Sequence, residues 1–239
     1  MEAVDPAFLD RVAQRAALLR ERLARCGAQG VEVLAVTKGF GVGAIVAALA
    51  AGFGRIGENY AQELIPKVTT ARQSGITPEV HFIGHLQTNK VRQMAPVVDV
   101  WQTVDRASAL SEVAKRAPGA RVYIQVNSTG EDAKAGCPPA DVEALVEGAV
   151  GAGLVVVGLM TMGPTDQDPG RTRAAFRLTR GVADRLGLSG CSMGMSDDLE
   201  IAVEEGSTLV RVGSALFGPR PPRGVAESPP AVEIGRAHV

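Results

Sequence analysis

Short apolar runs alternate with amphipathic stretches along most of this chain. The segment from Val33 to Lys38 is almost continuously apolar and is followed by glycine-rich sequence, a pattern typical of a strand buried on both faces of a parallel sheet. Similar runs predict further strands at residues 55–59, 80–84, 97–103, 121–127, 154–160, 191–193 and 208–212. Amphipathic spacing predicts helices at residues 6–25, 44–51, 61–74, 105–117, 139–150, 171–186 and 197–205.

The regular alternation of strands and helices predicts the fold class. Right-handed βα units in this number close into a single α/β domain, a (β/α)8 TIM-type barrel, which we place at residues 1–220 with its amino-terminal helix. Asp5 stands before Pro6 as the expected cap of that helix. A doubly wound open sheet is the alternative, because the strands at 55–59 and 191–193 are weakly patterned.

The carboxyl-terminal segment differs in composition from the barrel. Residues 221–239 form a tail in which prolines are frequent, and we expect it to be poorly structured. Residues 233–239 have no periodicity and match a translated sequencing-adapter sequence, so we exclude them from reasoning about the fold.

Composition excludes several classes of function. The chain has 25 basic and 26 acidic residues and no basic block, which argues against nucleic acid and anionic membranes as partners. No apolar run is long enough to span a bilayer. Three widely spaced cysteines without a CxxC pair fit a reducing compartment and no structural metal, so we expect a cytoplasmic protein.

Lys38 is the first candidate for chemistry. It stands at the carboxyl end of the first predicted strand, where α/β proteins place their ligand sites. Low-dielectric surroundings would lower the pKa of its amine and favour nucleophilic use. The alternative is a lysine that reaches past the strand end into solvent.

The last two predicted strands supply a second group of candidates. Arg211 stands near the end of the eighth strand, beside Lys38 in a closed barrel, and Gly213 with Ser214 follows it. Ser196 is suited to cap the helix after the seventh strand. Backbone N–H groups and hydroxyls in these loops can hold a phosphate. The alternative is that Ser196 only caps its helix and Gly213 only turns the chain.

An amine, a phosphate cradle and an arginine together match pyridoxal 5′-phosphate (PLP), which needs partners for its aldehyde, its phosphate and its ring nitrogen. The most specific motif of this chain is Ser192-Met193-Gly194-Met195-Ser196-Asp197-Asp198. Further characteristic segments are residues 35–38, 57–63, 81–90, 125–127, 131–136, 158–162 and 211–218. In all these segments the chain resembles the pyridoxal phosphate homeostasis proteins, which share the alanine-racemase-like barrel of fold-type III.

The resemblance implies roles for individual residues. Lys38 would form the Schiff base with PLP, while Ser196, Gly213 and Ser214 would hold the phosphate. The family commonly has threonine where Ser214 stands, and either hydroxyl can bind a phosphate oxygen.

Three further residues are expected around the ring. Arg211 would face the pyridine nitrogen, Asn59 would lie near the ring or its phenolic oxygen, and Met193 would line the pocket. An arginine can only donate hydrogen bonds, so the ring nitrogen stays unprotonated and stabilises carbanions less well. This disfavours transamination, although racemases tolerate the arrangement.

These expectations favour a carrier over an enzyme. Racemisation needs an acid–base group on each face of the substrate carbon, and we expect this chain to lack the second domain that supplies one in alanine racemases. We therefore expect a protein of PLP homeostasis or transfer, with little turnover and without catalytic residues, that exchanges PLP with apo-enzymes or amino acids and functions as a monomer. The alternatives are a PLP-dependent amino-acid racemase or lyase, and a phosphate-binding barrel enzyme that uses Lys38 without a cofactor.

Two histidines could suggest a metal site. His81 and His85 bracket Phe82-Ile83-Gly84, but their spacing of four suits metal ligands on a helix and not across a strand and turn. We expect each to be packed or hydrogen-bonded.

Overall fold

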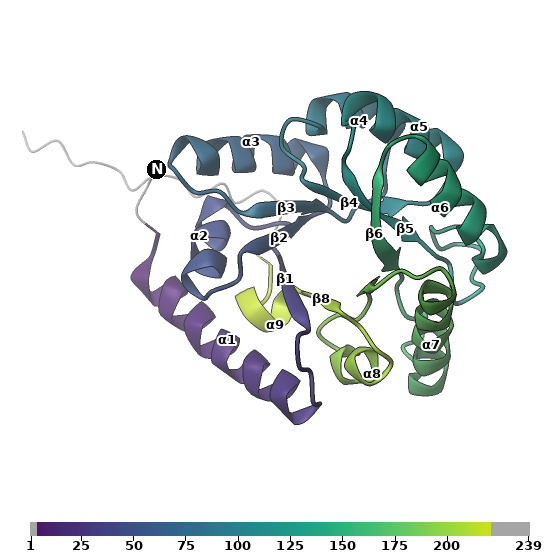
Figure 1. Cartoon of the computed structure of the whole chain (residues 1–239). Helices are drawn as coiled ribbons and strands as arrows, with labels where there is room; N and C mark the ends of the chain where they lie inside the picture. The colour runs from purple at the N-terminus through teal and green to yellow at the C-terminus, as the bar shows by residue number, and fades with distance from the viewer. Residues whose placement is uncertain (1–3, 221–239) are drawn as a thin grey trace, which may run out of the picture.

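In the computed structural model, which describes residues 4–220, the strands form one closed parallel barrel in chain order, from β1 to β8 (Figure 1). Strand β8 pairs with β1, so that Leu34 lies opposite Arg211 and Ala35 opposite Val212. This closure confirms the predicted barrel and rules out the open sheet. The strands are β1 Glu32–Val36, β2 Arg55–Glu58, β3 Glu79–Phe82, β4 Val100–Val104, β5 Arg121–Gln125, β6 Val155–Met160, β7 Gly190–Ser192 and β8 Leu209–Val212.

Helices surround the ring of strands (Figure 1). They are α1 Pro6–Arg25, α2 Val42–Ala50, α3 Ala61–Gln73, α4 Thr88–Met94, α5 Ala107–Arg116, η1 Pro139–Asp141, α6 Val142–Gly151, α7 Pro169–Arg185, α8 Leu199–Glu204 and α9 Ser214–Phe217. The sequence pattern did not predict α4, because it is short and mostly polar and buries only Val91 and Met94.

Helix α1 precedes the barrel and packs beside α2, α8 and α9. Its apolar stripe, Val12, Ala16, Leu19 and Leu23, is buried. The Asp5 side chain accepts a hydrogen bond of 2.9 Å from the Ala7 N–H, which confirms the predicted cap and satisfies one free donor of the first turn.

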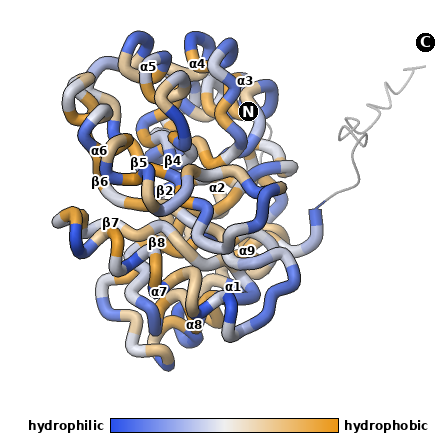
Figure 2. Tube along the Cα trace, turned by 90° about the vertical axis from the view of Figure 1, so that its right-hand side faces the viewer, coloured by the Kyte–Doolittle hydropathy of each residue, from blue (hydrophilic) through white to orange (hydrophobic). Residues whose placement is uncertain are grey.

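Hydrophobic residues form two layers. The larger layer lies between strands and helices, and the hydropathy of the outer helices alternates along the chain, as expected for helices with one buried face (Figure 2). The smaller layer fills the barrel and is contributed by Leu34, Val100, Tyr123, Met160 and Leu209 from strands on opposite sides. The barrel is therefore a packed core, with its loops free to build a site at one end. The predicted tail at 221–239 lies outside the described residues.

Candidate functional site at the carboxyl end of the barrel

The end of β1 and the loop after β8 lie side by side. A Cβ atom built on Gly213 would lie 3.5 Å from both the Cβ and the carbonyl oxygen of Val36, the last residue of β1. Lys38 follows two residues beyond Val36, so the strand ends earlier than the sequence predicted. Because β8 pairs with β1 in the closed barrel, Lys38 lies at the same rim as Arg211 and Gly213.

The environment of Lys38 favours its neutral amine. Burial lowers the pKa of Lys38, and the nearby charges of Arg220 and Arg211 lower it further, while Glu58 and Glu63 oppose the change. The side chain is half-buried. A lysine with a lowered pKa presents more free amine at neutral pH, which is the form that attacks a carbonyl carbon.

A buried ion pair supports the backbone next to Lys38. The Lys67 ammonium on α3 donates 2.7 Å to Glu58 Oε1 and 2.9 Å to the carbonyl oxygen of Thr37. The Thr37 hydroxyl donates 2.6 Å to the same Glu58 oxygen. Glu58 and Thr37 are fully buried, and burial raises the pKa of Glu58 while the Lys67 charge opposes it. The pair fixes the peptide from which Lys38 projects.

Arg211, on the strand that pairs with β1, is held by carbonyl and hydroxyl groups. Its Nη1 donates to the Ser192 carbonyl at 2.7 Å and to the Ser192 hydroxyl at 2.9 Å, and its Nη2 donates to the Thr161 carbonyl at 2.8 Å. Burial lowers the pKa of Arg211 to about 10, with the Asp198 charge opposing it. The guanidinium therefore stays charged at neutral pH and can only donate hydrogen bonds.

Arg211 begins a chain of hydrogen bonds that crosses the barrel interior. The Ser192 hydroxyl donates 2.7 Å to Gln102 Oε1, the Gln102 amide contacts His81 Nδ1 at 2.7 Å, and His81 Nε2 contacts Glu79 Oε1 at 2.7 Å. Burial lowers the pKa of His81, so a neutral ring with its proton on Nε2 satisfies both contacts. The chain connects the site to the amino-terminal end of the barrel.

The sequence did not single out several residues that this geometry makes important. Gln102 and Ser192 are polar residues in buried strands. A buried polar side chain needs a hydrogen-bond partner, so its presence in an apolar strand could have indicated an internal hydrogen-bond network. Glu58 stood inside a matching segment without an assigned role, and Lys67 stood in a helix that would otherwise expose it. Arg220, which lies against Gly39, stands at the boundary with the expected tail, and the sequence assigns it no role.

The predicted phosphate-binding residues lie in two neighbouring loops. Gly213 precedes α9, Ser214 is its first residue, and Ser214 is exposed. Ser196 lies in a turn before α8, and the helix begins at Leu199, so the predicted cap was wrong. Asp198 occupies the cap position instead and accepts a hydrogen bond from the Met195 N–H. The Ser196 side chain is thereby left for another role.

Asn59 and Met193 differ in their placement. Asn59 directly follows β2, and its Oδ1 atom is buried without a hydrogen-bond partner in the described residues. Such an atom is costly unless something else binds it. Met193 is fully buried and belongs to the hydrophobic layer between strands and helices. Met193 directly follows Ser192, the last residue of β7, and its place in the lining of the PLP pocket stays a prediction.

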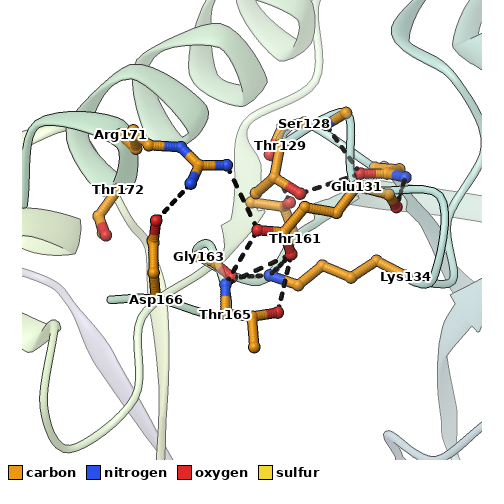
Figure 3. A network of polar contacts seen from close by, with 12 residues as sticks. Ser128, Thr129, Glu131, Lys134, Thr161, Gly163, Thr165, Asp166, Arg171 and Thr172 are labelled. Carbon is orange, nitrogen blue, oxygen red and sulfur yellow. Dashed lines mark hydrogen bonds and ion pairs between the residues drawn. The ribbon is translucent and has the colours of Figure 1, made fainter. Parts of the chain in front are cut away.

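Two further loops at this end are joined by an ionic network (Figure 3). Glu131, after β5, pairs with Lys134 at 3.1 Å and with Arg171 of α7 at 3.3 Å. It also accepts 2.8 Å from the Thr165 hydroxyl, and Lys134 donates to the Gly163 carbonyl. Hydrogen bonds from Thr165 and Lys134 lower the pKa of Glu131 to about 2. The network fixes the loops after β5 and β6 to each other.

His81 is buried and hydrogen-bonded, as expected, whereas His85 is exposed, so that prediction was wrong for His85. Across residues 4–220 no group of three or more His, Cys, Asp or Glu side chains could hold a metal ion. The helices in that range also include none with the length and apolarity needed to cross a membrane.

The comparisons with known proteins agree with this architecture. Residues 8–221 match the family model of the alanine racemase N-terminal domain. The alanine racemase of Corynebacterium glutamicum has the same fold, with a TM-score of 0.69 and 19% identity over 87% of this chain and 60% of that one. The structure defines a barrel of this class.

Two relatives are more similar. The pyridoxal phosphate homeostasis protein of Pseudomonas aeruginosa is 39% identical over 220 residues, which cover 88% of this chain and 95% of that protein. PipY of Synechococcus elongatus, solved with PLP bound, has a TM-score of 0.77 and 32% identity over 87% of this chain and all of that one. This chain belongs to the family of pyridoxal phosphate homeostasis proteins.

Proposed function

We propose that this chain binds PLP at the carboxyl end of its barrel and acts in intracellular PLP homeostasis, as a carrier with little or no turnover. The observation that carries the proposal is the meeting of Lys38 with Arg211 and Gly213 at one rim, where burial and two arginines lower the pKa of the Lys38 amine. The name of the curated relatives and the PLP-bound structure of PipY support the same ligand.

The residues present fit this cofactor. Asn59 Oδ1 is a buried acceptor without a partner among the described residues, and the Arg211 guanidinium is a fixed donor. The hydroxyls of Ser196 and Ser214 with the Gly213 backbone suit a phosphate. When bound, PLP supplies an aldehyde with which the Lys38 amine condenses to a Schiff base, with loss of water.

The protein's own side chains position the groups that would contact PLP. Lys67 and Glu58 hold the Thr37 peptide, so the Lys38 amine enters the site in one position. Arg211 would donate to the ring nitrogen of bound PLP and would not protonate it, because a guanidinium retains its proton at neutral pH. These tasks suit reversible holding of an aldehyde more than stabilisation of carbanions.

The test is the visible spectrum of the purified protein. We expect an absorbance band of an imine of PLP that is abolished in Lys38→Ala, and borohydride reduction should place a phosphopyridoxyl group on the peptide that contains Lys38. A protein that binds PLP without a label on Lys38 would contradict the covalent part of the proposal. A protein that takes up no PLP at all would contradict the whole.

A second experiment separates the carrier from an amino-acid racemase or lyase. The PLP-loaded protein is incubated with L-alanine in deuterated water, and exchange of the α-proton is followed by NMR. We expect less than one α-proton exchange per protein molecule over several hours. We also expect PLP to be transferred to an added apo-enzyme. Sustained exchange over many turnovers would establish an enzyme and overturn the carrier proposal.

We also propose that the protein is located in the cytoplasm and functions as a monomer.

A further inference from the structure

Arg22, in the last turn of α1, connects that helix to the loop at residues 193–198, which joins β7 to α8. Its Nε donates 2.9 Å to Glu200 Oε1 and its Nη2 donates 2.8 Å to Glu200 Oε2. The same Nη2 donates 3.2 Å to the Ser196 carbonyl oxygen. We propose that Arg22 is a positioning residue for the phosphate of PLP, because it holds the 193–198 loop in its binding conformation from outside the barrel. This inference rests on the proposed function and deepens it.

The contact between Arg22 and Glu200 has a defined geometry. A guanidinium that binds both oxygens of a carboxylate is held in one plane, so the direction of its N–H groups is fixed. Glu200 belongs to the first turn of α8, and both side chains are half-buried. Arg22 therefore fastens the Ser196 carbonyl to a helix on each side, α1 and α8, at the point where the loop ends.

The orientation of one peptide group shows what this contact does to the loop. In a trans peptide the carbonyl oxygen and the following N–H point in opposite directions. Because the Ser196 carbonyl points towards Arg22, the Asp197 N–H points away from α1. At the beginning of the loop, the Gly194 carbonyl accepts a hydrogen bond of 3.0 Å from the Arg211 N–H on β8. The loop is thus fixed to the barrel at one end and to α1 near the other.

Helix α1 also supports the second proposed phosphate-binding segment, which begins α9 at Ser214 (Figure 1). Leu216 and Phe217 of α9 are buried in one apolar cluster with the apolar stripe of α1. Directly after α9, a Cβ atom on Gly218 would lie 2.6 Å from Arg15 Nη1, so α1 approaches the end of α9 too closely for a side chain there. Both segments that are proposed to hold the phosphate therefore rest on α1, and Arg22 supplies the polar contact.

The alternative is that Arg22 only fastens α1 to α8. The two roles differ in their effect on pyridoxal, which has the ring and the aldehyde of PLP but no phosphate. A residue that positions the phosphate-binding loop should affect PLP and leave pyridoxal unchanged. A residue that only supports the fold should affect both ligands alike, or neither.

The first experiment titrates the apo-proteins of wild type, Arg22→Gln and Arg11→Gln with PLP and with pyridoxal, and measures affinity by the imine absorbance. Arg22→Gln should bind PLP about tenfold more weakly than wild type does and pyridoxal within about twofold of wild type. Arg11→Gln is the control, because it removes the same charge from the exposed face of α1, where Arg11 pairs with Asp5, and it should change neither affinity.

Two results of these titrations would overturn the inference: equal weakening of both ligands in Arg22→Gln, or PLP binding as tight as in wild type. A wild type that binds neither ligand would contradict the proposed function, and this inference with it. The failure of the inference alone is therefore distinct, because wild type then still binds PLP.

The second experiment separates positioning from a simple effect of charge. Glu200→Leu removes a negative charge beside the loop, so electrostatic attraction alone predicts tighter binding of the phosphate. Positioning predicts PLP binding weaker by about threefold or more, because Arg22 loses the carboxylate that orients it. In the apo-proteins, amide hydrogen exchange at residues 194–198 should be faster in Arg22→Gln than in wild type. Tighter PLP binding in Glu200→Leu, or unchanged exchange in Arg22→Gln, would overturn the inference.

Discussion

Arg211 donates a hydrogen bond of 2.9 Å to the Ser192 hydroxyl, and this contact gives a direction to the whole chain of hydrogen bonds in the barrel. An arginine cannot accept, so the Ser192 proton goes to Gln102, the Gln102 amide donates to His81, and neutral His81 donates to Glu79. Aligned hydrogen bonds polarise one another. The orientation of Arg211 at the rim is therefore set by residues deep inside the barrel.

Ser192→Ala should destabilise the protein and loosen Arg211. The substitution leaves Gln102 Oε1 buried without its donor, and an unpaired buried acceptor costs about 1–3 kcal/mol. Denaturant unfolding at neutral pH measures the loss. Ser74→Ala, which removes an exposed hydroxyl that donates to its own helix, should change stability by less than about 0.5 kcal/mol. If the free energy of unfolding of both variants falls by the same small amount, the hydrogen-bond chain inside the barrel does not stabilise the fold.

Lys67→Met should be far more costly than loss of a surface ion pair. It leaves the fully buried Glu58 carboxylate without its counter-ion, and breaking such a pair costs about 3–5 kcal/mol. Arg116→Met, which breaks an exposed i,i+4 pair with Glu112, should change stability far less, because solvent screens this pair. The measurement is the free energy of unfolding in guanidinium chloride.

The double variant Glu58→Gln with Lys67→Met should recover part of that stability, because neither residue then carries a buried charge. A double variant as unstable as the sum of the single ones would contradict the coupling.

Arg220→Gln should raise the pKa of Lys38. The Arg220 charge is the largest electrostatic contribution that lowers this pKa after burial, so its removal makes the protonated amine easier to form. The rate of reductive methylation of Lys38 in apo-protein, followed by peptide mass spectrometry as a function of pH, should shift its midpoint upward. Arg116→Gln, on the surface of α5, is the control and should leave the midpoint in place. A downward shift in Arg220→Gln would refute the assignment.

Glu131 should make stability depend on acid pH. Its pKa is about 2 in the folded protein against a reference of 4.5, so the carboxylate stabilises the fold above pH 4.5 and this stabilisation is lost as the pH falls towards 2. Wild type should therefore melt higher than Glu131→Gln at pH 6, and the difference should shrink at pH 3. Glu21→Gln, at an exposed position on α1, serves as the control. A difference that is the same at both pH values would argue against the ionic network of Figure 3.

The linear pattern was sufficient for the barrel and for the rim around Lys38. Strands that are buried on both faces of a parallel sheet read as continuous apolar runs, and eight of them with intervening helices close in only a few ways. Closure then places the end of β8 beside the end of β1, which is why Lys38, Arg211 and Gly213 could be grouped before any coordinates were known. Helix α4 was missed because a short polar helix has little periodicity to detect.

The tertiary structure alone decided which side chains meet. Ser192 and Gln102 are 90 residues apart, and Glu58 and Lys67 belong to a strand and a helix whose facing surfaces depend on register. A shift of one residue along a strand turns every side chain to the other face, so small differences in the position of an element change which residues meet. The sequence placed two such boundaries wrongly: β1 ends two residues before Lys38, and α8 begins three residues after Ser196. Composition and periodicity determine that a residue is buried, whereas the partner it finds depends on register and on contacts between distant segments.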